Sequence, residues 1–365
     1  MRFIKLFCLL LLTASFLFTP DDAFSQTRRS TKRVKRQRRT ISNRQATFAG
    51  RRLKFANAKQ YITFGVSLNA LNYFGDIVPK DRALSTDLAY TRPGLGISST
   101  ARLGKSFGLR AAFLYGRISS NDYAVADPGD DEAIYRYARN LQFRNNIKDL
   151  SLVGVYDFFP NPFTVSLRMR WTPYVFAGVS VFHHNPQGLV PDQAILTPDQ
   201  VDNPFTPAEA GEWVKLKPLQ TEGTSYSNFQ ISIPFGGGVR FRINQLIDVE
   251  AEFSYRYLFT DYLDDVSGNY VDKGTLGSET AKIMSDRSLE PVDAVSGDTR
   301  VDVRERLGTA YTSYTGADGV EYAYLPGYGN AGDQRGDDDR DIFVTTSVRI
   351  VFMVGALNFR SRGYR

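Results

Sequence analysis

Residues 229–259 read FQISIPFGGGVRFRINQLIDVEAEFSYRYLF, and apolar and polar side chains alternate on both sides of Asn244-Gln245. Successive side chains of a β-strand point to opposite faces, whereas a helix would spread these residues around its circumference. Each arm is about 13 to 15 residues long, compared with ~5–6 for most soluble strands. One aromatic-rich apolar face and one charged face are typical of a transmembrane β-barrel, with a long hairpin in a soluble sandwich as the alternative.

The same alternation recurs along the chain and predicts eight strands, at 60–71, 94–103, 107–118, 143–158, 170–182, 229–243, 247–259 and 342–354. Long and short connections alternate strictly: the long loops are 72–93, 119–142, 183–227 and 260–340, and the short turns are 104–106, 159–169 and 244–245. Outer-membrane barrels have an even strand count, short periplasmic turns and long external loops. Such long loops would be unusual in a soluble sandwich. We therefore predict an all-β fold, an eight-stranded antiparallel transmembrane β-barrel spanning residues 60–359 with long extracellular loops.

Charged residues fall on the polar faces of these strands. The interior of an eight-stranded barrel is just filled by side chains, and buried charges must be paired. We therefore predict an interior ion-pair network and no open channel. Its expected members are Arg102, Arg110, Arg240, Arg242, Glu250, Glu252, Arg256 and Arg349.

The first 25 residues have the pattern of a secretory signal peptide. Arg2 and Lys5 precede the apolar run 6–18, and Ala23-Phe24-Ser25 offers a cleavage site. Cys8, the only cysteine, lies inside this signal, so the mature chain has no thiol chemistry. Beyond it, no apolar run approaches the ~20 residues of a membrane helix. Export together with alternating aromatic strands indicates the outer membrane of a Gram-negative bacterium.

Residues 26–59 differ in composition from the rest of the chain. From 27 to 59 there are thirteen Lys or Arg residues and no acid, which explains the sequence pI of about 9.2. Such a block is disordered alone and commonly binds a partner, although a flexible solvated tether is the alternative. We predict a periplasmic arm that binds an acidic protein or cell-wall polymer, and no nucleic acid because the chain is exported. The binding residues would be Arg28, Arg29, Lys32, Arg33, Lys35, Arg36, Arg38 and Arg39, and a short basic tail, 360–365, follows the barrel.

Three motifs resemble those of a known family. They are Tyr73-Phe74-Gly75-Asp76-Ile77 after the first strand, the segment 141–147 (LQFRNNI), and Thr172-Pro173-Tyr174-Val175-Phe176-Ala177-Gly178. Over roughly residues 60–260 the chain is similar to the small Bacteroidota outer-membrane barrels, the family that contains PorG of the type IX secretion machinery. The resemblance implies a structural role as an outer-membrane anchor that contacts a periplasmic assembly. The basic arm, the long loop 260–340 and the ending after Phe359 depart from the family pattern.

Little in the sequence indicates catalysis. His183-His184 lies at the expected outer end of a strand, and Glu222, Ser225 and Ser227 are the nearest candidates for a lipid-modifying site. Adjacent strand residues face opposite ways, so only one histidine could face lipid. The acidic runs 127–131 and 333–341 lack the spacing of a calcium-binding EF-hand loop. We therefore expect no enzyme activity, no metal and no cofactor.

Three functions stay open at this point. The first is a non-enzymatic anchor or scaffold of an envelope assembly, and the second is a surface adhesion module that uses loops 183–227 and 260–340. The third is an outer-leaflet lipid-modifying enzyme. In each case outer-membrane lipid and lipopolysaccharide would surround the barrel.

Overall fold

The computed structural model describes residues 47–48, 51–52, 60–77, 90–126, 134–160, 168–300, 310–337 and 340–356. The chain divides into two units, Met1–Ala56 and Asn57–Arg365. In the first unit, β1 (Thr47–Phe48) pairs antiparallel with β2 (Arg51–Arg52). The predicted signal peptide, most of the basic arm and the tail 360–365 lie outside the described residues.

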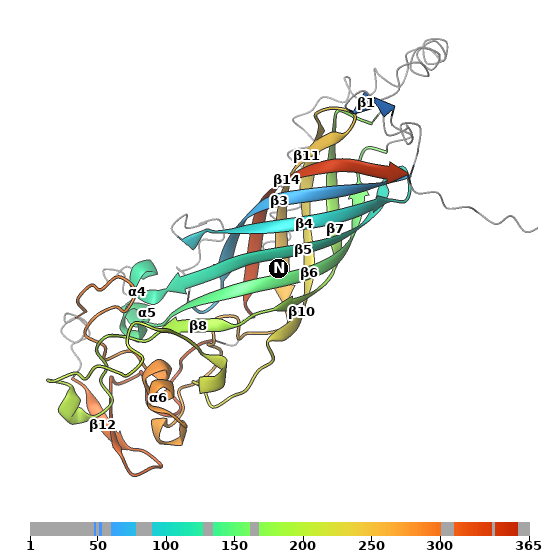
Figure 1. The fold of residues 1–365 in the computed structure, drawn as a ribbon. Coiled ribbons are helices and arrows are strands. Elements are labelled where there is room, and N and C mark those ends of the chain that lie inside the picture. Colours follow the sequence, from blue (N-terminus) through green and yellow to red (C-terminus); the bar gives the residue numbers. More distant parts are fainter. Residues whose placement is uncertain are drawn as a thin grey trace, which may run out of the picture. The chain divides into compact units, whose positions relative to one another are not determined.

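Eight long strands of the second unit close into a barrel (Figure 1). They are β3 (Tyr61–Phe74), β4 (Arg92–Arg102), β5 (Phe107–Asn121), β6 (Gln142–Asp157), β7 (Trp171–His183), β10 (Phe229–Arg242), β11 (Ile247–Leu258) and β14 (Ile342–Ala356). Each pairs antiparallel with the long strands before and after it, and β14 pairs with β3 to complete the circle. The predicted eight-stranded antiparallel barrel is confirmed, with strand ends within a few residues of those expected.

The alternation in sequence becomes an inside and an outside. On β3, Leu68 is 69% exposed, whereas Ser67 beside it is 5% exposed and faces the interior. The same contrast recurs around the barrel, so its outer surface is a continuous belt of exposed apolar side chains. Representative members are Phe64, Val66, Ile97, Phe113, Leu150, Val179, Ile231, Phe253, Val348 and Ile350.

The two ends of the barrel differ in their connections. At one end the strands are joined by short turns. In the β10–β11 turn the Asn244 side chain accepts hydrogen bonds from the backbone N–H groups of Leu246 and Ile247. An asparagine that satisfies the backbone two and three residues ahead is a typical turn former. All long connections lie at the opposite end, which we call the long-loop end.

The long connections are folded into a cap over the long-loop end (Figure 1). It contains α4 (Asp122–Val125), α5 (Ile134–Arg139), α6 (Glu279–Ser285), the short strands β8 (Pro186–Leu189), β9 (Trp213–Lys215), β12 (Thr312–Thr315) and β13 (Glu321–Tyr324), and the 3₁₀ turns η3 (Pro198–Gln200), η4 (Lys217–Leu219) and η5 (Lys273–Thr275). β6 runs past the barrel and pairs there with β8, which pairs with β9. No helix among the described residues is long and apolar enough to cross a membrane.

Candidate functional site

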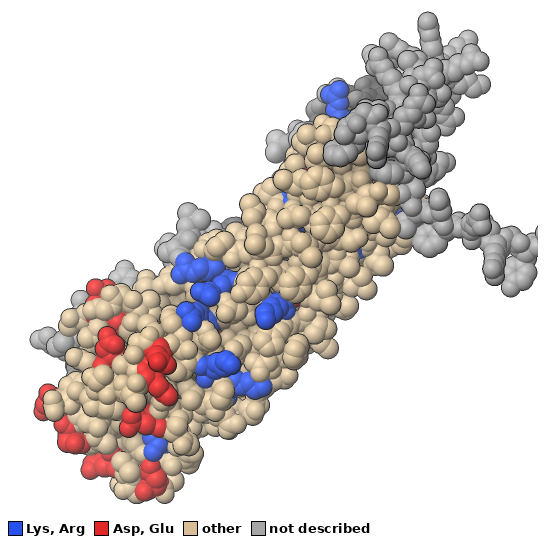
Figure 2. All heavy atoms as spheres, in the orientation of Figure 1, with Lys and Arg blue, Asp and Glu red and all other residues tan. Residues whose placement is uncertain are grey.

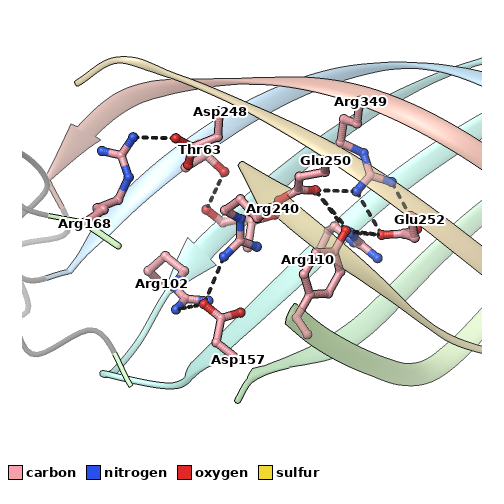
Figure 3. A network of polar contacts seen from close by, with 12 residues as sticks. Thr63, Arg102, Arg110, Asp157, Arg168, Arg240, Asp248, Glu250, Glu252 and Arg349 are labelled. Carbon is pink, nitrogen blue, oxygen red and sulfur yellow. Dashed lines mark hydrogen bonds and ion pairs between the residues drawn. The ribbon is translucent and has the colours of Figure 1, made fainter. Parts of the chain in front are cut away.

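Two glutamates on β11 are the centre of a charged cluster inside the barrel (Figure 3). Glu250 accepts hydrogen bonds from Arg240 at 2.7 Å and from Arg349 at 2.9 Å. Glu252 accepts from Arg110 at 2.6 Å and from Arg349 at 3.2 Å. These five side chains come from β5, β10, β11 and β14, so the cluster ties several walls of the barrel together.

Asp157 on β6 extends this cluster toward the short turns. It accepts hydrogen bonds from Arg102 at 2.5 Å and from Arg240 at 2.9 Å. The Tyr174 hydroxyl donates to Glu252 at 2.9 Å. We refer to the ionic members together as the interior network, which consists of Arg102, Arg110, Asp157, Arg240, Glu250, Glu252 and Arg349.

Strand register places the charges of the interior network opposite one another. Arg240 is the cross-strand partner of Glu250, which is in turn the partner of Arg349. Gly238 faces Tyr174, and a Cβ at this glycine would lie only 2.8 Å from the tyrosine hydroxyl. Glycine is therefore needed where the ring crosses the interior. Because every ion in the network has a partner, the desolvation cost of burial is offset, and removing one partner would be costly.

The structure separates two of the predicted members from the network. Arg256 lies nearer the long-loop end and pairs with Asp149 at 2.6 Å. Arg242 donates to the backbone carbonyl of Arg168 and forms no ion pair with a described residue. Its cross-strand partner, Asp248, pairs with Arg168 at 2.7 Å instead.

Several charged interior residues were missed by the sequence reasoning. Even-numbered residues from 150 to 158 face outward on β6, so odd-numbered residues such as Asp149 and Asp157 face the interior. This alternation was available in the sequence and could have found both. Arg168 precedes β7 and follows no alternation, so only the fold brings it to Asp248.

Above the interior network, apolar side chains pack around the Arg256–Asp149 pair, whose guanidinium lies over the Phe343 ring. A cluster of buried side chains fills the long-loop half of the barrel and its mouth: Leu71, Tyr73, Ile77, Leu114, Ile118, Leu141, Phe143, Ile147, Phe182, Leu258, Leu263, Val266 and Phe343. Leu263 and Val266 belong to the connection 259–341 and not to a strand. Packing of loop residues onto inward-facing strand residues joins the cap to the barrel through an apolar layer.

Buried arginines connect the loops of the cap. Arg139 on α5 pairs with Asp122 at 2.8 Å, and it donates to the backbone carbonyls of Asp76 at 2.8 Å and Arg335 at 2.6 Å. Three long connections thus meet at one guanidinium. The Asp122 charge raises the pKa of Arg139 above its usual value, although burial acts in the opposite direction.

A second buried arginine, Arg335, repeats this arrangement. It pairs with Glu222 at 2.9 Å and donates to the carbonyls of Asp265 at 2.8 Å and Ser285 at 3.1 Å. Arg300 donates only to carbonyls among the described residues, including that of Tyr137 at 2.7 Å. The described parts of the four loops are therefore joined to one another through buried arginines.

A group of acids lies where the cap meets the barrel. The Tyr73 hydroxyl is 2.6 Å from Asp264 and 2.7 Å from Asp341, although a phenol has one proton to donate. Both contacts are satisfied only when one of the two carboxyls carries a proton. Burial, and then the charge of Asp76, raises the pKa of Asp264 well above its ordinary range. Burial likewise raises the pKa of Asp76 to about 7 and that of Asp261 to about 6.

Of the two adjacent histidines, His184 faces the interior and makes no hydrogen bond to an acid among the described residues. His184 is fully buried, its Nε2 lies 2.9 Å from the carbonyl of Ser227, and its ring stacks on Tyr226. Burial lowers the pKa of His184 to about 4, so the ring is neutral. Of the proposed partners, Glu222 is engaged by Arg335. Instead of joining an acid–base pair, His184 packs at the base of the cap.

Two predicted features fall on residues that the structure does not describe. The arm residues 28–39 and the acidic run 127–131 lie outside the described residues. In the described part of the chain, no group of three or more histidine, cysteine, aspartate or glutamate side chains is arranged to hold a metal ion.

The fold and the interior define a class of protein: a closed eight-stranded antiparallel barrel with an apolar outer belt and a charged, side-chain-filled interior. A family described as a domain of unknown function (DUF6089) matches residues 51–203, which is less than half of the chain. A comparison with curated proteins gives no match.

Solved structures of small barrels share this architecture. Neisserial surface protein A (NspA) is 9% identical, with 80% of this chain and 97% of that chain covered and a TM-score of 0.33. The outer membrane protein OprG from Pseudomonas aeruginosa is 9% identical, with 82% and 98% covered and a TM-score of 0.34. Ail, the attachment invasion locus protein of Yersinia pestis, is 9% identical, with 82% and 99% covered and a TM-score of 0.31. These are similarities of fold alone.

Proposed function

We propose that this chain is an outer-membrane barrel that does not conduct solutes and that anchors a rigid cap on the outer face of the cell. The interlocking of the cap by the buried arginines Arg139, Arg300 and Arg335 carries the proposal. The surface of rigid loops is already ordered before a partner binds. Binding therefore does not carry the entropic cost of ordering the loops.

The belt of exposed apolar side chains supports the membrane location. Contiguous apolar surface on this scale is unfavourable in water and is the usual lipid-facing surface of a barrel. Because long loops are external in outer-membrane barrels, the cap would face outward. Fractionation of cells that express the chain tests this directly, with recovery in the outer membrane expected. Recovery of folded protein in the periplasm would contradict it.

The filled interior supports an anchoring role over transport. The interior network occupies one half of the barrel and the apolar layer the other. We expect no conductance steps when the purified protein is reconstituted into planar lipid bilayers. Variants of Glu250 would serve as positive controls, because loss of network partners should admit water and ions. Stable conductance steps from the unaltered protein would contradict this proposal and indicate that the barrel is a pore.

A second candidate is the scaffold role in an envelope assembly, possibly that of type IX secretion. It is favoured by the thirteen basic residues without an acid between 27 and 59 and by the resemblance to the family containing PorG. Affinity capture of the tagged protein from solubilised outer membranes, alongside a variant lacking 27–59, tests it. Recovery of periplasmic assembly subunits that the deletion abolishes is expected. If the same proteins are recovered without the arm, the arm has no such role.

A further inference from the structure

Basic side chains gather on the outer surface just beyond the apolar belt. Figure 2 shows Lys and Arg in a band between the belt and the end of the molecule where Asp and Glu gather. Four basic residues on the outer surface at the long-loop end are exposed or partly exposed: Arg117 on β5, Arg144 and Lys148 on β6, and Lys215 on β9. We call these four residues the basic patch.

Strand register brings these residues together. Arg117 lies opposite Asn146, one outward position away from both Arg144 and Lys148 along β6. Arg144 lies opposite Gln187 on β8, which lies opposite Lys215. The basic patch is therefore a continuous surface over four paired strands.

The two arginines of the basic patch are held in place by neutral groups. Arg117 donates to the Asn146 side chain at 2.8 Å, and Arg144 donates to that of Gln187 at 2.9 Å. The Arg144 guanidinium also stacks over the Trp213 ring, 4.0 Å from its centroid. Stacking and single hydrogen bonds fix the orientation of a guanidinium and leave other N–H groups for a ligand.

The charges of the basic patch are not balanced by the protein. Among the described residues, none of the four forms an ion pair, and the charge of Arg117 acts unfavourably on Arg144. Every fully buried arginine of the cap and interior, by contrast, is engaged by carboxylates or carbonyls. Like charges held together without an acid are costly and attract an anion.

The location of the basic patch indicates which anion. Toward the long-loop end, Lys148 on β6 and Arg117 on β5 are the next outward-facing residues beyond the lipid-facing Leu150 and Tyr115. Tyrosine and tryptophan are frequent at the level of lipid headgroups, where Tyr115 and Trp213 lie beside the patch. Any anion at this height is therefore at the boundary between acyl chains and water.

We propose that the basic patch binds the phosphate groups of anionic lipid in the outward-facing leaflet. This inference rests on the proposed outer-membrane location with the cap outside. Arginine and lysine pair with phosphate by charge-assisted hydrogen bonds, and the adjoining apolar belt accommodates the acyl chains of the same molecule. The patch thus selects phosphorylated lipid over neutral lipid as the neighbour of β5 and β6.

The test is a titration of the purified full-length mature protein in neutral detergent with diphosphoryl lipid A, compared with its dephosphorylated form. Tryptophan fluorescence reports binding, because Trp213 stacks under Arg144 and the chain has only two tryptophans. The variant carries Arg117→Gln and Lys148→Gln. The matched control carries Lys105→Gln and Arg170→Gln, which removes two exposed charges at the short-turn end.

The unaltered protein and the control should bind diphosphoryl lipid A with equal affinity. The patch variant should bind about 25-fold more weakly, since each of the two lost charges near a lipid surface contributes about a fivefold factor. Equal binding by all three proteins overturns the proposal, as does equal weakening of both variants. Displacement of the lipid by an equal concentration of inorganic phosphate overturns the lipid as ligand. Because the titration is independent of cellular location, its failure is distinguishable from failure of the fractionation test.

Discussion

The barrel interior and the cap both bury arginines, but three arginines of the cap are satisfied differently from those of the barrel, whereas Arg287 of the cap pairs with the Glu290 carboxylate as the barrel arginines do. In the barrel, Arg349 and Arg110 donate to carboxylates across the strands. In the cap, Arg300 donates only to backbone carbonyls among the described residues, and Arg139 and Arg335 combine one carboxylate with carbonyls of other loops.

Backbone geometry explains the contrast. In a closed sheet nearly every backbone N–H and C=O is paired in the ladder, so an inward guanidinium must find a side-chain acceptor. Loops leave carbonyls without a ladder partner, and a buried arginine with five donors can satisfy several at once. Arg168 and Arg242 support this reading, because both lie beside a turn of the barrel and both bond to carbonyls.

The largest expected effect is in the interior network. Glu250→Ala removes one of the carboxylate acceptors of both Arg240 and Arg349 and should lower the free energy of unfolding by about 3 to 5 kcal/mol. Urea unfolding of the protein in lipid vesicles, followed by the gel mobility of the folded barrel, measures this. Glu250→Gln keeps an acceptor oxygen, so its free energy of unfolding should lie between those of the wild type and Glu250→Ala. An unchanged unfolding midpoint would show that the network does not stabilise the barrel.

A smaller and more local effect is expected in the cap. Arg300→Met removes the buried donor to the carbonyls of Tyr137, Ala138 and Glu290 and should destabilise the cap by about 2 to 4 kcal/mol. Hydrogen exchange should rise in 134–141 and 287–300 while the strands stay protected. Equal loss of protection in the barrel would mean that the barrel and the cap unfold as one unit. The cap would then not be a separate region of stability.

The acids at the junction should make cap stability depend on pH. Raised carboxyl pKa values mean that the folded cap holds protons more tightly than the unfolded chain, so stability falls as pH rises from about 4 to about 7. Each unit of raised pKa corresponds to about a tenfold change, so exchange of the amides in 260–270 should be at least about tenfold less protected at pH 8 than at pH 5. Asp264→Asn can donate to the Tyr73 hydroxyl, whose proton then goes to Asp341, and should reduce this dependence. The same pH dependence in wild type and variant would exclude Asp264 as its source.

The smallest effect concerns the two arginines on β10. Arg242→Gln loses a hydrogen bond to one turn carbonyl and should cost only about 0.5 to 1.5 kcal/mol. Arg240→Gln, two residues away, removes partners of Glu250 and Asp157 and should cost considerably more. Comparison of the two unfolding midpoints checks whether alternation alone identifies network members. Equal costs would contradict the separation of Arg242 from the network.

Alternation in the sequence was sufficient for the strands, their inward faces and the order of long and short connections. It was also sufficient to place Arg240, Glu250 and Arg349 inside. It failed for Arg242 because alternation shows which face of the sheet a side chain lies on but not how far along the barrel axis it lies. At the rim of a barrel, backbone carbonyls of the turns compete with carboxylates as hydrogen-bond acceptors. The cap had no comparable signal, since its contacts join residues with no repeating spacing.

The sequence by itself determined the barrel, because a period of two places every second residue of a strand on one face whatever its neighbours are. Only the tertiary structure decided the partners. Arg139 donates to the carbonyl of Arg335, which lies 196 residues further along the chain. The Tyr73 hydroxyl contacts Asp341, which lies 268 residues further along. Such contacts depend on where the closed barrel places the ends of the loops. They also depend on which buried carbonyls and carboxyls then need a hydrogen-bond donor. No local pattern encodes that geometry.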